Sequence, residues 1–292
     1  MKKRIISAVA IICLIAIFAT LSGCQKKVDI TVLTGEINAG ATAEINVLHT
    51  SDTHLTYYDN TDTAEVRRYG KSRYRHFGQN MQQTLDEIVA MAKEENRLLI
   101  HTGDLLDFET DANIQKAKEF FDESDCLYVP GNHETEADAS YVEKLQAVYK
   151  RNLTFYCEEI NGVCFVGLDN TNHKMTAEQL DLLKEVVETG KPIILLMHVP
   201  LYEEGLFYES IKADGSAYLM AVPEEMMTDY PEMRYEQQKA DEITYTAYEY
   251  IISQPNIKAI LAGHLHLSYE CSVGNVKQYV VGRNTVRKIT IK

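Results

Sequence analysis

The sequence predicts an α/β fold in which short buried strands alternate with amphipathic helices. From Ile45 onward, apolar runs of strand length are followed by stretches whose apolar residues recur at helical spacing. The chain has 292 residues, of which 45% are hydrophobic and 25% charged, a composition typical of globular proteins. We therefore expect one large domain over residues 45–292, preceded by an N-terminal leader.

The expected elements follow one another in a regular order. Strands are expected at residues 45–48, 98–101, 127–129, 193–197 and 257–261, and helices around 81–89, 114–121 and 243–251. Asn161-Gly162 predicts the turn of a hairpin over 154–168. Thr176 and Gln179 form a capping box that begins another helix, and the tail over 269–291 alternates like antiparallel strands.

The N-terminus has the three-part layout of a secretory signal peptide. Basic residues 2–4 precede an apolar run from Ile5 to about Phe18, and small residues follow. The run ends in Leu21-Ser22-Gly23-Cys24, which resembles the lipobox of bacterial lipoproteins. We expect a signal peptide over 1–23, a lipidated Cys24, and a spacer over 24–44 with an edge strand at 28–33. The protein would then be exported and lipid-anchored to the outer face of the cell membrane.

An uncleaved anchor helix is the alternative interpretation of this leader. The apolar run lies at or below the ~17 to 25 residues that a membrane-spanning helix needs. The remaining cysteines, Cys126, Cys157, Cys164 and Cys271, are expected to be buried small hydrophobic residues, because the hairpin register sets Glu159 rather than Cys157 opposite Cys164. Export permits disulfides without requiring them, so their status stays open.

The overall charge is strongly acidic. The chain carries 43 acidic and 29 basic side chains, a formal net charge of −14. Proteins that bind DNA or RNA usually present a basic patch, so nucleic acid is an unlikely partner.

Short polar motifs follow the predicted strands directly, where open α/β sheets place their ligand-binding loops. In chain order these motifs are Asp52-Thr53-His54, Gly103-Asp104-Leu105-Leu106-Asp107, Gly131-Asn132-His133-Glu134, His198, and Gly263-His264-Leu265-His266. Together they supply two carboxylates, four imidazoles and an amide oxygen, a ligand set that suits Mn, Fe, Zn or Co. If the Asp-x-His and His-x-His pairs are extended, their side chains point to one side and reach the same cavity.

These motifs, in this order, resemble the full signature of calcineurin-like metallophosphoesterases over about residues 45–292. The resemblance implies two facing mixed β-sheets flanked by helices, with two metal ions in loops at one edge of the sandwich. By the family pattern, Asp104 would bridge the two ions. The first ion would be held by Asp52, His54, Asp104 and His266, and the second by Asp104, Asn132, His198 and His264.

The resemblance also implies a reaction, the hydrolysis of phosphate mono- or diesters by a water activated between the two metals. His133 would stabilise or protonate the departing oxygen, and Asp107 matches the acidic residue that holds its other ring nitrogen. A purple acid phosphatase would need a tyrosine where this chain has Asp107, so that branch is disfavoured.

Two segments are candidates for substrate contact. Basic residues gather in a predicted loop after the first motif, where Arg67 or Arg73 would bind phosphate as a bidentate fork. The stretch 201–239 is predicted to be a long irregular insertion that walls the cleft, with Tyr202, Tyr208 or Arg234 as contacts. His76, His101 and His173 match no ligand position and are interpreted as ordinary surface or core residues.

Two rival functions are a non-catalytic metal-binding scaffold and a nuclease of the same superfamily. The complete ligand set and His133 favour an enzyme over a scaffold, and the acidic charge disfavours a nuclease. The substrate is expected to be a small phosphate ester. The ligands specify phosphoryl chemistry, whereas the natural substrate, monoester or diester preference, the metals and the oligomeric state are left open.

Overall fold

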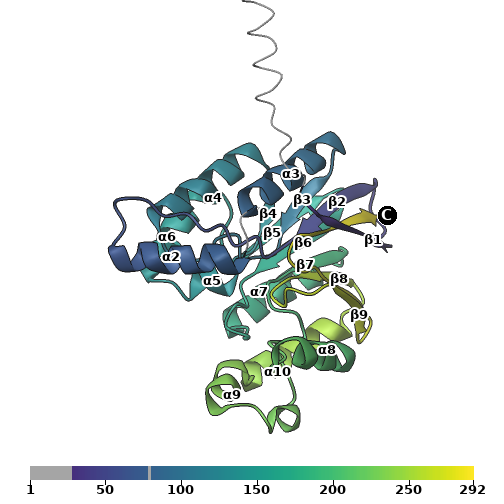
Figure 1. Cartoon of the computed structure of the whole chain (residues 1–292). Coiled ribbons are helices and arrows are strands. Elements are labelled where there is room, and N and C mark those ends of the chain that lie inside the picture. Colours follow the sequence, from purple (N-terminus) through teal and green to yellow (C-terminus); the bar gives the residue numbers. More distant parts are fainter. Residues whose placement is uncertain (1–27, 78–79) are drawn as a thin grey trace, which may run out of the picture.

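The computed structural model describes residues 28–77 and 80–292 (Figure 1). The predicted signal peptide and lipidated Cys24 lie outside these residues. Within the part of the chain that is described, no helix has the length and apolar character needed to cross a membrane.

The strands form two mixed sheets. The first has the order β1-β11-β2-β3-β4, in which β2, β3 and β4 run parallel and β11 pairs with β2 in antiparallel fashion. The second has the order β5-β6-β7-β8-β10-β9, with β6, β7, β8 and β10 parallel. Their bounds are β1 Thr31–Ile37, β2 Ile45–Thr50, β3 Leu98–His101, β4 Leu127–Tyr128, β5 Phe155–Ile160, β6 Val163–Leu168, β7 Ile193–Leu196, β8 Ile257–Ala262, β9 Tyr269–Val273, β10 Val276–Val280 and β11 Thr285–Ile291.

The two sheets face each other across a shared hydrophobic core. Strand β6 is buried along its whole length, and its alternate residues serve different layers. Val163 and Phe165 join the core between the sheets, while Cys164 and Val166 pack on the outer face with helices α7 (Ala177–Glu188) and α10 (Glu242–Ser253). The predicted α/β class and sandwich of two mixed sheets are therefore confirmed.

The other helices cover the first sheet or surround its carboxyl edge (Figure 1). Their bounds are α2 Ala64–Phe77, α3 Met81–Glu94, α4 Asp111–Glu123, α5 Asn132–Thr135 and α6 Ala139–Val148. Helix α7 begins at the predicted capping box of Thr176 and Gln179. The edge strand expected at 28–33 is β1, which begins three residues later and pairs with β11 at the edge of the first sheet.

Two local expectations were wrong, and a third was confirmed. The basic segment after the first motif is not a loop but helix α2, because its residues at positions i, i+4 and i+8, Tyr69, Arg73 and Phe77, contact the protein along one face. The antiparallel strands expected in the tail are confirmed, because β9 pairs with β10 and β11 pairs with β2 in antiparallel fashion, although β10 belongs to the second sheet and β11 to the first. Cys157 is exposed and Cys271 only half-buried, whereas Cys126 and Cys164 are buried as expected; all four cysteines of the described residues are free.

The stretch 201–239 is also more ordered than predicted. It contains α8 (Glu204–Asp214), a 3₁₀ turn η1 (Glu224–Met227) and α9 (Glu232–Gln238). It has a small hydrophobic cluster of its own, including Leu206, Leu219 and Met227, which packs against Val280 of β10. This insertion forms the lower lobe in Figure 1 together with α10.

Candidate metal centre

The predicted ligands converge because their strands end at the same edge of the sandwich. Asp52 and His54 follow β2, Asp104 follows β3, and Asn132 opens α5 after β4. His198 follows β7, and His264 and His266 follow β8 in the facing sheet. Loops at the carboxyl ends of parallel strands meet in this way, so the fold explains why residues so distant in sequence lie together.

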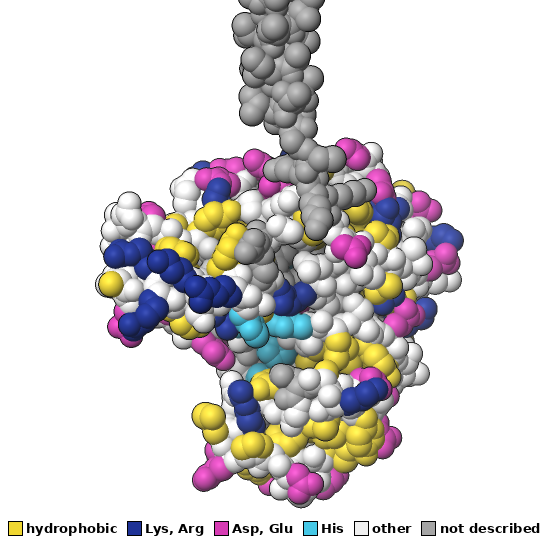
Figure 2. All heavy atoms as spheres, in the orientation of Figure 1, with side chains coloured by type: hydrophobic (Ala, Val, Ile, Leu, Met, Phe, Trp, Pro, Cys, Tyr) yellow, Lys and Arg dark blue, Asp and Glu magenta, His cyan; other side chains and the backbone are white. Residues whose placement is uncertain are grey.

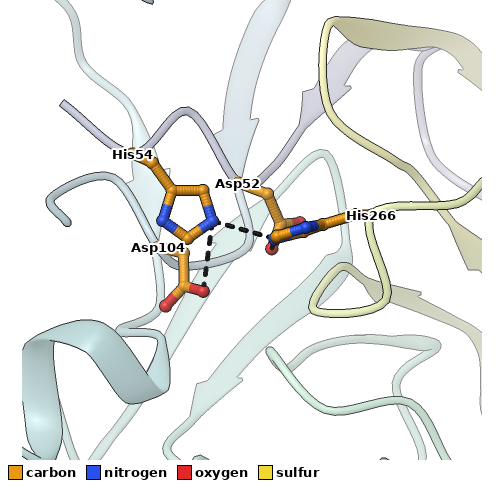
Figure 3. A group of neighbouring side chains, drawn as sticks. All are labelled: Asp52, His54, Asp104 and His266. Carbon is orange, nitrogen blue, oxygen red and sulfur yellow. Dashed lines mark hydrogen bonds and ion pairs between the residues drawn. The ribbon is translucent and has the colours of Figure 1, made fainter. Parts of the chain in front are cut away.

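The first ligand group consists of Asp52, His54, Asp104 and His266 (Figure 3). The Nε2 atoms of His54 and His266 lie 2.9 Å apart. His54 Nε2 lies 3.6 Å from Asp104 Oδ2, and His266 Nε2 lies 3.6 Å from Asp52 Oδ1. Figure 3 shows these side chains directed toward a common centre.

The second group shares Asp104 with the first and adds His198 and His264. His198 Nε2 lies 3.5 Å from Asp104 Oδ2, 3.0 Å from His264 Nδ1 and 3.3 Å from Asn132 Oδ1. Asp104 thus stands between two sets of nitrogen and oxygen donors. This is the position of a bridging carboxylate in a two-metal site.

The hydrogen bonds around the histidines fit metal binding. His198 Nδ1 donates to the Thr102 carbonyl at 2.7 Å, and His54 Nδ1 to the Asp107 carboxylate at 3.1 Å. With Nδ1 protonated, the Nε2 lone pair of each ring faces the centre, as in metal-bound histidines held by an outer carboxylate or carbonyl. His264 Nε2 is buried without a hydrogen-bond partner in the described chain. These residues fit a pair of cations.

The electrostatics favour positive charge at the centre. Burial raises the pKa of Asp104, but the surrounding His198, His133 and His54 outweigh it and hold the pKa well below its ordinary value. Burial, opposed by His198 and helped by Asp104, raises the pKa of Asp52 to about 7. Burial also lowers the pKa of His266 to about 3, so that this ring stays neutral, the form that binds metal.

The ligand backbone is not extended as the spacing suggested. Asp52, His54, Asp104, His264 and His266 all have positive φ angles between 48° and 71°. Their side chains reach the centre because tight left-handed turns follow the strands, a conformation rare outside glycine and asparagine and concentrated at functional sites. The extended backbone that would let this spacing bring the side chains together is therefore absent, although the side chains do meet.

Glycines in the motifs allow the loops to approach closely. A Cβ on Gly131 would lie 2.0 Å from Asp104 Oδ1, and one on Gly263 would lie 1.8 Å from Ser51 Oγ. Glu134, which has no expected role in the motif, is fully buried. Its carboxylate accepts hydrogen bonds from the backbone N–H groups of Asp104, Leu106 and Gly131, and so ties two ligand loops together.

His133 lies beside the centre and is held by Asp107 in two ways. His133 Nδ1 donates to the Asp107 backbone carbonyl at 2.8 Å, while the Asp107 carboxylate lies 3.5 Å away. That carboxylate is bound more closely by Arg73, through Nε to Oδ2 and Nη2 to Oδ1, both at 2.7 Å. Arg73 therefore fixes Asp107, which in turn contacts both His54 and His133.

The other predicted substrate contacts lie apart from the ligands. Arg67 donates to the Asp62 carbonyl near the start of α2. Arg234 lies over the ring of Tyr218, 5.0 Å from its centroid. Tyr202 packs in the cluster of the insertion, and Tyr208 is exposed.

Two residues near the ligands were missed in the sequence. The ring of His173 lies 5.3 Å from that of His264, and the ring of Tyr218 lies 5.8 Å from it. His173 is buried, and neither ring nitrogen has a hydrogen-bond partner among the described residues. Its place in the polar run 169–173 after β6 was a usable signal, because the other motifs also follow strands. Nothing in the sequence around Tyr218 marks it.

A cavity of about 330 Å³ opens beside the centre. Asp104, Asn132, His133, His264 and His266 line it on the ligand side, and residues of the insertion line the opposite side. In Figure 2 the histidines are visible at the surface, between the upper body and the lower lobe.

Comparison with known proteins identifies the family. Residues 45–268 match the family model described as calcineurin-like phosphoesterase. A dimetal phosphatase from Danio rerio is 15% identical, with a TM-score of 0.52, over 82% of this chain and 87% of that one. Comparison with the curated proteins gives no match.

Two further solved structures are similar at lower scores. The calcineurin-like phosphoesterase YfkN from Bacillus subtilis is 14% identical, with a TM-score of 0.42, over 80% of each chain. The phosphopantetheinyl hydrolase PptH from Mycobacterium tuberculosis is 13% identical, with a TM-score of 0.41, over 82% of this chain and 90% of that one. With its family match and its buried His/Asp cluster, this chain belongs to the calcineurin-like phosphoesterase family and is a metallophosphoesterase, a hydrolase of phosphate ester bonds.

Proposed function

We propose that this protein hydrolyses phosphate monoesters or diesters with a water activated at a two-metal centre, and that a lipid on Cys24 holds it at the outer face of the cell membrane. The position of Asp104 carries the hydrolytic part, because its carboxylate belongs to both ligand groups. His133 borders the same cavity as those groups. Two adjacent ligand sets beside a proton donor suit phosphoryl transfer better than binding alone.

The residues divide between the two ions as their contacts suggest. The mixed nitrogen and oxygen donors suit Mn, Fe, Zn or Co. When bound, two such ions supply Lewis acidity, which lowers the pKa of a water and neutralises charge on the phosphoryl oxygens. One ion would be held by Asp52, His54, Asp104 and His266, and the other by Asp104, Asn132, His198 and His264.

His133 would supply the proton that the leaving oxygen needs. Its Nδ1 must carry a hydrogen, because the Asp107 carbonyl opposite can only accept. Burial lowers the pKa of His133, but the Asp104 carboxylate, the carbonyl and carboxylate of Asp107, and the Glu134 carboxylate act together to raise it. A protonated ring then has its second hydrogen on Nε2, available to a departing alkoxide in the cavity.

The location rests on the leader pattern alone. Cys24 precedes β1 by only a few residues, so a lipid there would hold the domain close to the membrane surface. Growth with an alkyne-labelled fatty acid tests this: the wild type should be labelled and sediment with membranes, and Cys24→Ser should be neither. An unlabelled wild type would remove the anchoring proposal without affecting the hydrolytic one.

The decisive experiment loads the full-length protein, in mild detergent, with Mn or with Zn and Fe. Hydrolysis of p-nitrophenyl phosphate and bis-p-nitrophenyl phosphate is measured beside metal content, with Asp104→Asn and His133→Asn as controls. We expect two metals per wild-type chain and turnover of at least one ester. Asp104→Asn should lose metal and activity, whereas His133→Asn should keep metal and lose activity.

The alternatives predict different results. A scaffold would bind metal without hydrolysing any ester in a broad panel, and a nuclease would prefer oligonucleotides over both small esters. A wild type without metal would overturn the proposal.

A further inference from the structure

The backbone conformation marks residues beyond the predicted ligands. Eleven non-glycine residues of the described chain have positive φ angles. Five are predicted ligands, and three are asparagines, which tolerate this conformation in turns. The remaining three are His173, Tyr218 and Ala221, with φ angles of 64°, 50° and 63°.

A left-handed backbone at a tyrosine is an outlier that costs free energy and persists only where the surroundings enforce it. The surroundings of Tyr218 do so. Its N–H donates to Gln238 Oε1 at 3.1 Å, and the preceding N–H of Ala217 donates to Tyr230 Oη at 2.7 Å. Downstream, Met220 pairs with the segment that follows His198. The insertion thus holds this one ring in place against strain.

The ring of Tyr218 is also supported from two sides. Its plane stands at 78° to that of His264, in an edge contact typical of aromatic pairs. The Arg234 guanidinium lies over the ring, which still lines the cavity beside the centre. Arg234 itself is not among the described residues that line this cavity.

The wall that Tyr218 belongs to carries no charge. Away from the ligands, the described side chains that line the cavity are Ser210, Ala213, Ser216, Tyr218, Leu265 and Leu267. A second cavity, of about 560 Å³, also borders His133, and its lining includes the carboxylates of Glu65, Glu109 and Glu136 and the aromatic rings of Tyr69 and Phe108. His133 borders both cavities, so a leaving group next to it could lie in either. We call the cavity beside Tyr218 the neutral cavity and the one lined by the three glutamates the acidic cavity.

We propose that Tyr218 contacts the leaving group, and that the neutral cavity selects phosphate esters whose leaving group is uncharged and has a flat unsaturated ring. This rests on the proposed function and names its substrate class. The neutral cavity shares Asp104, His264 and His266 with the metal centre, so a phosphoryl group there places its ester oxygen near His133 and its remainder against Tyr218. A flat ring gains by packing on an aromatic side chain, and no cationic side chain of the described residues lines this wall to pair directly with an anionic leaving group.

The test uses substrates that differ in the leaving group alone. Benzyl phosphate and cyclohexylmethyl phosphate have alcohols of similar size and acidity, of which only the first is flat. For the metal-loaded full-length protein, kcat/KM should favour benzyl phosphate. Tyr218→Ala should lower kcat/KM for benzyl phosphate about 10-fold and change the cyclohexylmethyl ester little, while Tyr218→Phe keeps the preference. Tyr208→Ala, an exposed tyrosine of α8 outside the cavity lining, is the matched control.

A second variant tests charge without touching a buried residue. Ala213 is exposed at the end of α8 and lines the cavity. Ala213→Lys should raise kcat/KM for 4-carboxybenzyl phosphate relative to benzyl phosphate by about 3-fold, the size of one partly screened charge. An unchanged ratio would overturn the placement of the leaving group.

Other outcomes also decide. Equal losses on both esters in Tyr218→Ala would reduce Tyr218 to a structural role, and a preference for phosphocholine would place the leaving group in the acidic cavity; either overturns the proposal. Calorimetry then compares the binding of benzylphosphonate and cyclohexylmethylphosphonate to the wild type and to Tyr218→Ala. Because neither phosphonate is hydrolysed, this measurement tests the placement of the leaving group separately from the proposed hydrolysis. If no ester is hydrolysed but the flat phosphonate binds more tightly through Tyr218, the proposed reaction fails and the cavity assignment stands.

Discussion

The two sides of the metal centre are built differently. On one side, α2 carries charged residues, of which Arg73 turns inward to Asp107 while Arg68, Lys71 and Arg75 are exposed. On the other side, the insertion presents a neutral wall around Tyr218. Figure 2 shows a row of dark-blue side chains over α2, whereas the lower lobe is largely yellow and white with a few dark-blue side chains at its upper edge. The difference suggests a division of work: the charged side positions the catalytic groups and attracts anions, and the neutral side selects the leaving group.

The largest loss of activity should come from displacing Asp104 in the metal centre, which both sides border. Gly131→Ala would place a Cβ 2.0 Å from Asp104 Oδ1 and 2.2 Å from its backbone nitrogen. Gly131 has an ordinary φ of −104°, so the clash alone acts. We expect displacement of Asp104, loss of metal by mass spectrometry, and a fall in kcat/KM of about 100-fold or more, as a displacement of about 1 Å can produce.

Gly190→Ala is the control for this prediction. Its Cβ meets nothing within 4 Å, although the φ of 70° strains any side chain. This variant should lose about 1 kcal/mol of stability and keep its metal. Full metal content in Gly131→Ala would show that the close approach of the two loops is dispensable.

A smaller loss of activity should follow from changing the charged side alone, at Arg73. Arg73 binds Asp107 with a bidentate fork, and the Asp107 side chain is fully buried. Arg73→Ala should lower kcat about 10- to 100-fold by freeing His133 and His54, and Arg73→Lys should restore little, because an ammonium cannot replace the fork. Arg68→Ala, on the exposed face of the same helix, is the control. The benzyl preference should survive in Arg73→Ala; its loss would mean that the two sides do not act separately.

The same contrast explains what could be predicted from the sequence. The ligand positions followed from local patterns, since each motif comes directly after a strand and three of the five begin with a glycine. The fold class followed from alternating strands and helices, whereas the sandwich came from the family resemblance. Those features are encoded by neighbours in sequence.

The features that were missed depend on distant contacts. Helix α2 has a polar surface and is stabilised by contacts such as that of Phe77 with His54, whose rings stack at 4.1 Å. The insertion folds because Leu206 and Met227 pack against Val280, more than fifty residues away. The strained backbone of Tyr218 depends on Gln238 and Tyr230. The sequence pattern within these segments does not predict contacts with such distant partners.

Raising the pH should lower the free energy of unfolding by about 1 kcal/mol, through a tyrosine that supports the first sheet on the charged side. Tyr149 accepts a hydrogen bond from Tyr128 N in β4, the strand that leads to Asn132 and His133. Burial raises the pKa of Tyr149 to about 12, above the ~10 of an unfolded chain, so its stabilising contribution is complete below pH 10 and is lost as pH rises through 12. At pH 11 the loss is roughly 1 kcal/mol.

Urea unfolding at pH 9 and pH 11 measures this contribution. Tyr149→Phe should be less stable than wild type at pH 9, because it leaves the Tyr128 N–H unpaired, and the difference should shrink at pH 11. Besides burial, Tyr149 also helps to raise the pKa of its neighbour Tyr156, so Tyr156→Phe and the double variant are measured beside Tyr149→Phe to separate the two contributions. A constant difference at the two pH values would exclude titration of Tyr149 as a source of alkaline instability.

The smallest effect should come from the exposed charges of α2. The triple variant Arg68→Gln, Lys71→Gln and Arg75→Gln removes three cations beside the cleft of an otherwise acidic protein. At low salt we expect kcat/KM for an anionic ester to fall about 3-fold with kcat unchanged, and the difference to vanish near 0.5 M salt, because exposed charges act by screened attraction. Lys184→Gln, Lys191→Gln and Lys258→Gln change the same charge around α7 and the starts of β7 and β8, away from the carboxyl edge that carries the ligands. If both triple variants lose the same factor, net charge rather than the position of α2 attracts the substrate, and the charged side then contributes only through Arg73.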